Sequence, residues 1–427
     1  MKYYIITYGC QMNKSDSEKI AGLLEKLGYS PASKPIEANL VIINACSVRQ
    51  SAIDRVFGQI ENLNKIKKLN KKLKIILTGC LLEKDKKILK TKVDRILNIK
   101  ELNQWPLYLK PESAKLNFDY FSMPPIYQSS FKAFIPIMTG CNNYCSYCVV
   151  PYTRGQEVSR KVKGVLNEAN LLANNHYKEL TLLGQNVNSF NPPDKENFSK
   201  QNPFRHNFAR LLWEINQIKN LARIHFISAH PKDMTSEVIK ALTLPKQINY
   251  LHLPIQSGSN KILKLMNRGY SSEDYLQLIH EIRKTKPEIA LGTDIIVGFP
   301  NETEEDFQKT LDIYQKIKFD IAYIAIYSPR SQTLAAKIYP DNLSYSEKKK
   351  RWNKLHQLME KITFEKNQKY KNKTVSILVE KSNKGYLWGN SSEMKLVKLK
   401  GPKKIIGQIV QAKIKESKTW VLKGELL

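Results

Sequence analysis

The spacing of six cysteines constrains this chain more than any other feature of its sequence. Three of them, Cys141, Cys145 and Cys148, form a C-x3-C-x2-C run directly after a predicted strand. Three thiolates on one tight loop can hold three irons of a four-iron cluster and leave the fourth iron open to a small molecule. A zinc site with a distant fourth ligand is the alternative, although such sites normally use paired C-x2-C elements.

The other three cysteines, Cys10, Cys46 and Cys80, lie far apart in sequence, but each follows directly on an apolar strand. In a parallel sheet such strand ends share one edge, where open α/β sheets place their ligands, so the three thiols can converge. Three separately buried cysteines are the alternative. Six cysteines in a chain with no export signal do not suggest a disulfide scaffold, so metal binding or catalysis is expected.

Hydrophobic patterning divides the 427 residues into three parts, and the predicted class is α/β. Strands at 3–7, 40–43 and 74–77 with helices at 15–27 and 51–63 predict a Rossmann-like parallel domain over 1–118. A proline-rich stretch at 105–128 reads as a linker. The segment 127–362 is expected to form a partial (β/α)6 barrel with strands at 134–138, 179–183, 223–228, 250–253, 290–297 and 321–327. A helix is expected at 346–370. The segment 365–427 is expected to form a small β-barrel with four short strands at 375–379, 396–399, 405–414 and 420–422.

The formal charge is 69 − 39 = +30, which favours a polyanionic partner such as nucleic acid. A generally lysine-rich composition would produce the same excess without any binding role. No uncharged apolar run approaches the roughly 20 residues that span a bilayer. We therefore expect a cytoplasmic protein with no membrane partner.

The cysteine loop, with Tyr147 before its last cysteine, resembles the cluster loop of radical S-adenosylmethionine enzymes, and with Cys10, Cys46 and Cys80 it resembles their methylthiotransferase family. The likeness covers nearly the whole chain. Within the family, Gln11-Met12-Asn13 and Gly184-Gln185-Asn186-Val187-Asn188 resemble the branch that makes 2-methylthio-N6-dimethylallyladenosine in tRNA. Further matching segments are Asp16-Ser17-Glu18, Cys46-Ser47-Val48-Arg49, Arg154-Gly155, His252-Leu253-Pro254-Ile255-Gln256-Ser257-Gly258, Met266-Asn267-Arg268-Gly269-Tyr270 and Thr293-Asp294-Ile295-Ile296-Val297-Gly298-Phe299-Pro300. Leu81-Leu82-Glu83 and Ser331-Gln332-Thr333 depart from the family pattern.

The resemblance implies two [4Fe–4S] clusters and S-adenosylmethionine as cofactors. Cys141, Cys145 and Cys148 would hold the radical-generating cluster, and Cys10, Cys46 and Cys80 an auxiliary cluster that carries the sulfur, so all six would be catalytic as well as metal ligands. Radical chemistry suits C2 of an adenine because acids and bases cannot activate that carbon. Expected cofactor contacts near strand ends are Tyr147, Gly184, Gln185, Ser228, His230, Gln256, Ser257 and Gly298. His230 could instead be a core histidine, and Gly298 part of a plain turn.

The implied substrate is the isopentenylated adenosine at position 37 in the anticodon stem-loop of tRNA, held in part by lysines of the tail together with Tyr386 and Trp388. A solvated lysine surface is the competing interpretation of the tail. The enzyme would also need an electron donor such as flavodoxin or ferredoxin and a sulfur source, and we expect a monomer. The alternatives are a methylthiotransferase for threonylcarbamoyladenosine and a non-catalytic iron–sulfur RNA-binding protein.

Overall fold

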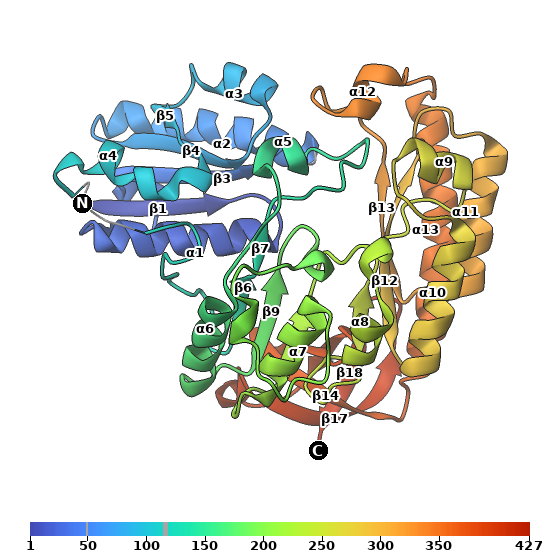
Figure 1. Ribbon diagram of the computed structural model, residues 1–427. Helices are drawn as coiled ribbons and strands as arrows, with labels where there is room; N and C mark the ends of the chain where they lie inside the picture. Colours follow the sequence, from blue (N-terminus) through green and yellow to red (C-terminus); the bar gives the residue numbers. More distant parts are fainter. Residues whose placement is uncertain (48–49, 114–117) are drawn as a thin grey trace.

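The computed structural model describes residues 1–47, 50–113 and 118–427 of the chain. Figure 1 shows an N-terminal α/β domain above a central set of strands and helices, with a small β-barrel at the opposite end. Val48 and Arg49, which belong to the family-like segment after Cys46, lie outside the described residues. Within the described ranges, no helix combines the length and the apolar character that crossing a membrane requires.

The N-terminal domain is a parallel sheet in the order β2-β1-β3-β4-β5, with helices on both faces. Ile42 on β3 packs into the α1 side, whereas its neighbours Val41 and Ile43 pack into the α2 side. This alternation explains why a fully apolar strand is buried on both faces. The elements are β1 (Lys2–Thr7), α1 (Gln11–Lys26), β2 (Ser30–Pro31), β3 (Leu40–Cys46), α2 (Gln50–Leu69), β4 (Lys74–Cys80), α3 (Glu83–Leu89) and β5 (Arg95–Ile96).

The predicted linker at 105–128 is packed against the N-terminal domain where the structure describes it. It contains α4 (Pro106–Leu109), and Trp105 and Met123 are buried in the core that α1 covers. The Trp105 Nε1 atom donates a hydrogen bond to the Asn98 carbonyl at 3.0 Å. A stretch without a sequence period is therefore held in place by two large side chains. The boundaries expected for the three domains remain predictions.

The central domain is the predicted partial barrel of six parallel strands. They form the sheets β10-β9-β6 and β11-β12-β13, joined by a parallel bridge between Ile224 and Gln247. The strands are β6 (Lys132–Pro136), β9 (Glu179–Leu183), β10 (Arg223–Phe226), β11 (Tyr250–His252), β12 (Ala290–Val297) and β13 (Ile321–Ile326), with the short pair β7 (Met138–Thr139) and β8 (Val158–Ser159). The helices are α5 (Val150–Arg154), α6 (Val162–Asn174), α7 (Asn207–Gln217), α8 (Ser236–Ala241), α9 (Asn260–Leu265), α10 (Ser272–Thr285), α11 (Glu304–Ile317) and α12 (Leu334–Ile338).

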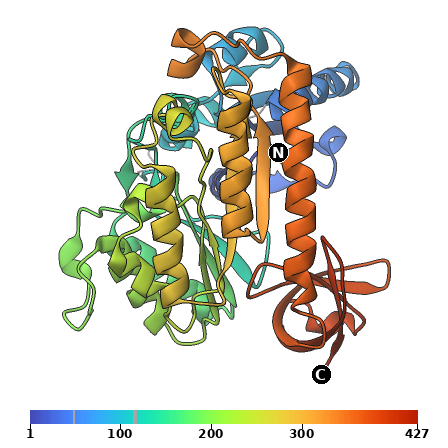
Figure 2. The ribbon, with the colours of Figure 1, turned by 90° about the vertical axis from the view of Figure 1, so that its right-hand side faces the viewer.

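A long helix, α13 (Tyr345–Gln368), runs beside β13 down to the C-terminal barrel (Figure 2). That barrel closes in the order β14-β15-β16-β18-β17. Its strands are β14 (Thr374–Asn383), β15 (Tyr386–Ser391), β16 (Leu396–Leu399), β17 (Ile409–Ser417) and β18 (Leu422–Leu426). The expected strand at 405–414 begins only at Ile409, because residues Lys403–Ile405 form a 3-10 turn. The sequence did not predict β15.

The two ends of the central strands meet different parts of the molecule. At the amino ends, Arg223 at the start of β10 donates to the Ser376 carbonyl at 2.8 Å, and Lys132 at the start of β6 pairs with Glu380, so the small β-barrel covers this end. The carboxyl ends face the N-terminal domain (Figure 1). Parallel barrels bear their catalytic loops at the carboxyl ends. The fold therefore places the cysteine loop next to the N-terminal sheet.

Candidate active site

The loop that bears Cys141, Cys145 and Cys148 connects β7 to α5 and is fixed at several points. Gly140 has φ +81°, and a Cβ there would lie 1.9 Å from the Gln156 carbonyl oxygen, so this turn requires glycine. The Gly140 N–H donates to Gln185 Oε1 at 2.6 Å. On the other side, the Ser146 hydroxyl donates to the Leu265 carbonyl at 2.7 Å. The loop is thus held by the segment after β9 and by α9.

The three thiols of this loop line one cavity of about 680 Å³. Burial, together with the neighbouring Cys145, raises the pKa of Cys148 to about 12, and burial also raises the pKa of Cys141. Without a metal, the Cys141 and Cys148 thiols are therefore neutral at pH 7. The expected residues that line the same cavity are Cys141, Cys145, Tyr147, Cys148, Gln185, Ser228, His230 and Gln256.

Two of the lining residues keep a buried polar atom that has no hydrogen-bond partner among the described residues, namely Nε2 of His230 and Oε1 of Gln256. His230 accepts a hydrogen bond from the Lys232 N–H at its other ring nitrogen. Burial, followed by the charge of Arg268, lowers the pKa of His230 to about 2, so the ring is neutral. An open atom on each side chain is what a bound polar ligand needs.

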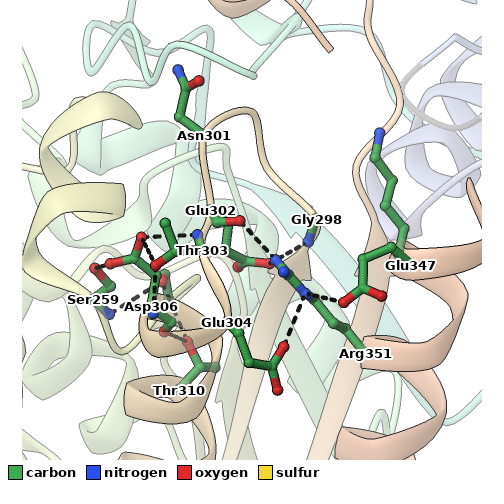
Figure 3. Close-up of polar contacts among 12 residues, drawn as sticks. Ser259, Gly298, Asn301, Glu302, Thr303, Glu304, Asp306, Thr310, Glu347 and Arg351 are labelled. Atoms are coloured by element: carbon green, nitrogen blue, oxygen red, sulfur yellow. Dashed lines mark hydrogen bonds and ion pairs between the residues drawn. The ribbon is translucent and has the colours of Figure 1, made fainter. Parts of the chain in front are cut away.

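The other three expected cofactor contacts lie outside the lining of this cavity. A Cβ at Gly184 would lie 2.5 Å from Met138 Cγ, and the buried Ser257 hydroxyl lies 3.4 Å from Thr310 Oγ1. The Gly298 N–H donates to Glu302 Oε2 at 2.8 Å, and the same carboxylate accepts from Arg351 Nη1 at 2.7 Å (Figure 3). These three residues shape the backbone next to the cavity, and their roles remain predictions.

The cavity also contains residues to which the sequence analysis assigns no role. Arg268 Nη1 lies 3.2 Å from Cys145 Sγ and 3.3 Å from the Tyr147 hydroxyl, and the side chain is buried. Deeper in the barrel, His252 Nε2 lies 3.3 Å from Asp294 Oδ2. Arg268 does belong to a family-like segment, but no local pattern shows that an arginine after a short helix will turn inward.

The second group of cysteines meets at the carboxyl edge of the N-terminal sheet. Cys46 and Cys80 are direct partners in the register of β3 and β4. A hydrogen bond with Cys46, aided by the charge of Arg154, lowers the pKa of Cys80 to about 6 against the opposing effect of burial. Cys10 is exposed and stands at the N-cap of α1. A Cβ on the adjacent Gly9 would lie 3.0 Å from Cys46 Cβ, so the two segments are in close contact.

Gln11, the residue after Cys10, lines the same cavity as the loop of Cys141, Cys145 and Cys148. The cavity is therefore bordered by both domains, although Cys10, Cys46 and Cys80 are not themselves among its lining residues. All six cysteines are among the described residues, and none of them is in a disulfide. In residues 1–47, 50–113 and 118–427, no three His, Cys, Asp or Glu side chains are grouped to hold a single metal ion. A four-iron cluster does not require such grouping, because each thiolate binds a different iron.

Comparison with known proteins agrees with this division of the chain. Residues 2–98 match the family described as uncharacterized protein family UPF0004, residues 135–313 the radical SAM superfamily, and residues 368–427 the TRAM domain. The radical S-adenosylmethionine methyltransferase TsrM from Kitasatospora setae has a similar fold, with a TM-score of 0.56 at 12% identity over 78% of this chain and 77% of that one.

Two curated relatives align with the whole chain. The tRNA-2-methylthio-N(6)-dimethylallyladenosine synthase of Thermoanaerobacter sp. (strain X514) is 40% identical over 100% of this chain and 92% of its own length. The enzyme of the same name from Alkaliphilus oremlandii is 42% identical over 100% and 93%. The chain therefore belongs to the tRNA-2-methylthio-N6-dimethylallyladenosine synthase family of radical S-adenosylmethionine enzymes.

Proposed function

We propose that this chain adds a methylthio group to C2 of N6-(dimethylallyl)adenosine at position 37 of tRNA, consuming two molecules of S-adenosylmethionine. The observation that carries the proposal is the single cavity, which has three cysteines of one loop on one wall and Gln11, next to Cys10, on another. The full-length relatives favour this reaction over methylthiolation of threonylcarbamoyladenosine and over a non-catalytic RNA-binding role.

As a radical S-adenosylmethionine enzyme, the chain uses S-adenosylmethionine and a [4Fe–4S] cluster. Cys141, Cys145 and Cys148 would hold the cluster, and their placement on one fixed loop facing a cavity fits that role. When bound, the cluster supplies the electron that cleaves S-adenosylmethionine to a carbon radical, the reagent that an unactivated adenine carbon needs. His230 Nε2 and Gln256 Oε1 would give the bound S-adenosylmethionine two polar partners in the cavity.

Cys10, Cys46 and Cys80 would hold a second [4Fe–4S] cluster, whose role is to present the sulfur that is transferred. The register of Cys46 and Cys80 and the close contact between Gly9 and Cys46 support this assignment. The hydrogen bonds at Cys80 stabilise a thiolate, which is the form that binds iron. Three ligands leave one iron without a protein ligand, which suits transfer of sulfur better than a purely structural site would.

The C-terminal TRAM barrel would bind the tRNA. Seven of the tail lysines that we expected to contact tRNA phosphates are exposed, namely Lys371, Lys373, Lys381, Lys384, Lys400, Lys403 and Lys404. Lys395 does not belong to this group: it is buried and its Nζ lies 2.9 Å from Asp320 Oδ1. Lys398 Nζ lies 3.6 Å from the ring centre of Tyr386 and 5.6 Å from that of Trp388, so a cation already lies against both aromatic rings.

The electron donor would be a flavodoxin or ferredoxin, and a separate sulfur source would reload the second cluster. We further propose that the protein acts as a cytoplasmic monomer on the anticodon stem-loop. The electron donor and the sulfur source follow from the proposed chemistry, which consumes electrons and sulfur that the chain itself does not regenerate.

Nucleoside analysis of tRNA from a deletion strain tests the substrate. Loss of the 2-methylthio group from isopentenyl-adenosine, restored by the wild-type gene but not by Cys148→Ala, is the expected result. Loss from the threonylcarbamoyl nucleoside instead would overturn the proposal.

Iron and sulfide analysis after anaerobic reconstitution tests the two clusters. The wild-type chain should bind about eight irons, as two four-iron clusters require. Cys10→Ala should reduce the iron to about half while S-adenosylmethionine cleavage persists. Cys148→Ala should also lose about half the iron, but with it all cleavage. About four irons in the wild type would disprove the second cluster.

A further inference from the structure

Arg154 connects the two cysteine groups across the domain boundary. It ends α5, six positions after Cys148, and so belongs to the central domain. Its side chain reaches the N-terminal domain, where Nε lies 3.0 Å from Cys80 Sγ. Only 3% of Arg154 is exposed, so this contact is shielded from water.

The rest of the guanidinium is occupied by Asp16, which lies on α1 and is fully buried. Arg154 Nη2 donates to Asp16 Oδ2 at 2.5 Å, and Nη1 donates to Oδ1 at 3.3 Å. Asp16 Oδ1 also accepts a hydrogen bond from the Tyr120 hydroxyl at 2.6 Å. The two hydrogen bonds to Asp16 fix the plane of the guanidinium, since a bidentate pair allows little rotation. The remaining Nε–H is therefore directed at the sulfur of Cys80.

A buried ion pair by itself is weak evidence for any role, because the cost of desolvating both charges can exceed their attraction. The contact with Cys80 is what distinguishes this pair. Arg160 provides a comparison within the chain: it forms a buried ion pair with Glu168 in the central domain, and its guanidinium also donates to the Pro136 carbonyl and not to a cysteine. A hydrogen bond to a ligand sulfur and a nearby positive charge both favour the reduced, more negative state of an iron–sulfur cluster.

We propose that Arg154 is a positioning residue for the second cluster: it fixes Cys80 relative to the loop of Cys141, Cys145 and Cys148 and raises the reduction potential of the cluster that Cys80 helps to hold. This inference rests on the proposed cluster at Cys10, Cys46 and Cys80. Arg268 has no equivalent bridging role, although it contacts Cys145. Its other partners, the hydroxyls of Tyr147 and Tyr270 and the Pro254 carbonyl, lie in the same domain as that cysteine.

The test isolates the second cluster in the full-length chain by replacing Cys141, Cys145 and Cys148 with alanine. The midpoint potential of the remaining cluster is then measured anaerobically by a reductive titration followed by electron paramagnetic resonance. Arg154→Gln should shift the midpoint to more negative values, because it removes the positive charge from the buried site. Arg154→Lys keeps the positive charge but cannot form the bidentate pair with Asp16 that directs Nε–H at the sulfur. The midpoint potential of this variant should therefore also shift to more negative values, but by less.

Arg160→Gln is the matched control, since it breaks a buried ion pair without touching a cysteine, and its midpoint should equal that of the parent. Unchanged midpoints in both Arg154 variants would overturn the inference. If the parent with three alanines binds no iron, the proposed second cluster itself fails, which is a different result from an unchanged midpoint. With all six cysteines present, Arg154→Gln should also form more 5′-deoxyadenosine per methylthiolated nucleoside than Arg160→Gln.

Discussion

His225 adds a third unsatisfied atom to the cavity wall. Its Nε2 is buried and, like His230 Nε2 and Gln256 Oε1, has no hydrogen-bond partner among the described residues. Leaving a buried polar atom unpaired costs about 1–3 kcal/mol. Three such atoms in one cavity indicate a space that is organised for a ligand and stays less stable until the ligand binds.

The neutral state of His225 predicts a pH dependence of stability. Burial, with His252 as the lesser cause, lowers the pKa of His225 to about 3. The unfolded chain binds this proton below about pH 6.5, and the folded chain does not, so acid favours unfolding down to about pH 3. Between pH 7.5 and 5.5, His225 should lower the free energy of unfolding by about 1.4 kcal/mol. Anaerobic urea titrations should show a correspondingly smaller loss in His225→Gln, and an equal loss would contradict the assignment.

At the scale of elements, α13 holds the turn after β12 through Arg351 and Glu302, both buried (Figure 3). Gly298 in this turn has φ +69°, and a Cβ there would lie 2.3 Å from Lys348 Cγ on the same helix. The helix thus packs too closely for any residue larger than glycine at this position. A helix distant in sequence thus fixes the turn after β12, which itself lies outside the lining of the cavity.

Removal of one partner of this pair should be costly. Arg351→Ala leaves the Glu302 carboxylate buried without its cation, which typically costs about 3–5 kcal/mol. Glu304→Gln is the control, since the Glu304 side chain is 62% exposed and lies 3.7 Å from Arg351 Nε, and it should cost less than about 1 kcal/mol. Urea unfolding midpoints measure the loss of stability in both variants. Similar midpoints would show that the buried ion pair stabilises the fold no more than the exposed contact does.

Many elements could be predicted because their hydrophobic patterns are regular. The strands at Glu179–Leu183, Ala290–Val297 and Leu396–Leu399 have the bounds that the sequence indicated. The strand Tyr386–Ser391 was missed because a glycine and polar residues interrupt its pattern, although Leu387 and Gly389 point inward. The helix α1 begins four residues earlier than expected because Cys10 caps it, and cysteine carries no capping signal in the sequence.

At the scale of the whole molecule, Asp320 joins the central domain to the C-terminal barrel. Its carboxylate lies 2.6 Å from Lys366 Nζ of α13 and 2.9 Å from Lys395 Nζ of the barrel. Against the effect of burial, the charges of Lys395 and then Lys366 lower the pKa of Asp320. The stabilisation is therefore present above about pH 4 and is lost as the pH falls through the lowered pKa.

Asp320→Asn should loosen the C-terminal barrel, because the buried Lys395 and the partly buried Lys366 lose their counter-charge, at a typical cost of about 3–5 kcal/mol. Limited proteolysis should cut the variant faster near the end of α13 than the wild type. Asp312→Asn is the control, since Asp312 is exposed and its carboxylate accepts a hydrogen bond from Gln308 on the same helix. Equal cleavage of Asp320→Asn and Asp312→Asn would refute the joining role.

The meeting of Cys10, Cys46 and Cys80 could be anticipated because strands of a parallel sheet end at one edge. The roles of Asp16, Arg154 and Arg268 could not, since charged residues in loops and at helix ends usually face solvent. The burial of Asp16 and Arg154 arises from the contact between domains, whereas Arg268 is buried within the central domain. No local window of sequence contains either set of contacts. Sequence reasoning thus found the thiols, and it marked the two arginines only as parts of family-like segments, without a role.

The cavity that Gln11 and the loop of Cys141, Cys145 and Cys148 border is lined by all three parts of the chain, including Lys395 and Trp420 of the C-terminal barrel. No part of the chain encloses it without the others. During synthesis, the first hundred or so residues emerge with three thiols and no opposite wall, so the reactive centre comes into existence only when the later strands dock. The cavity is therefore complete only when the whole chain has folded.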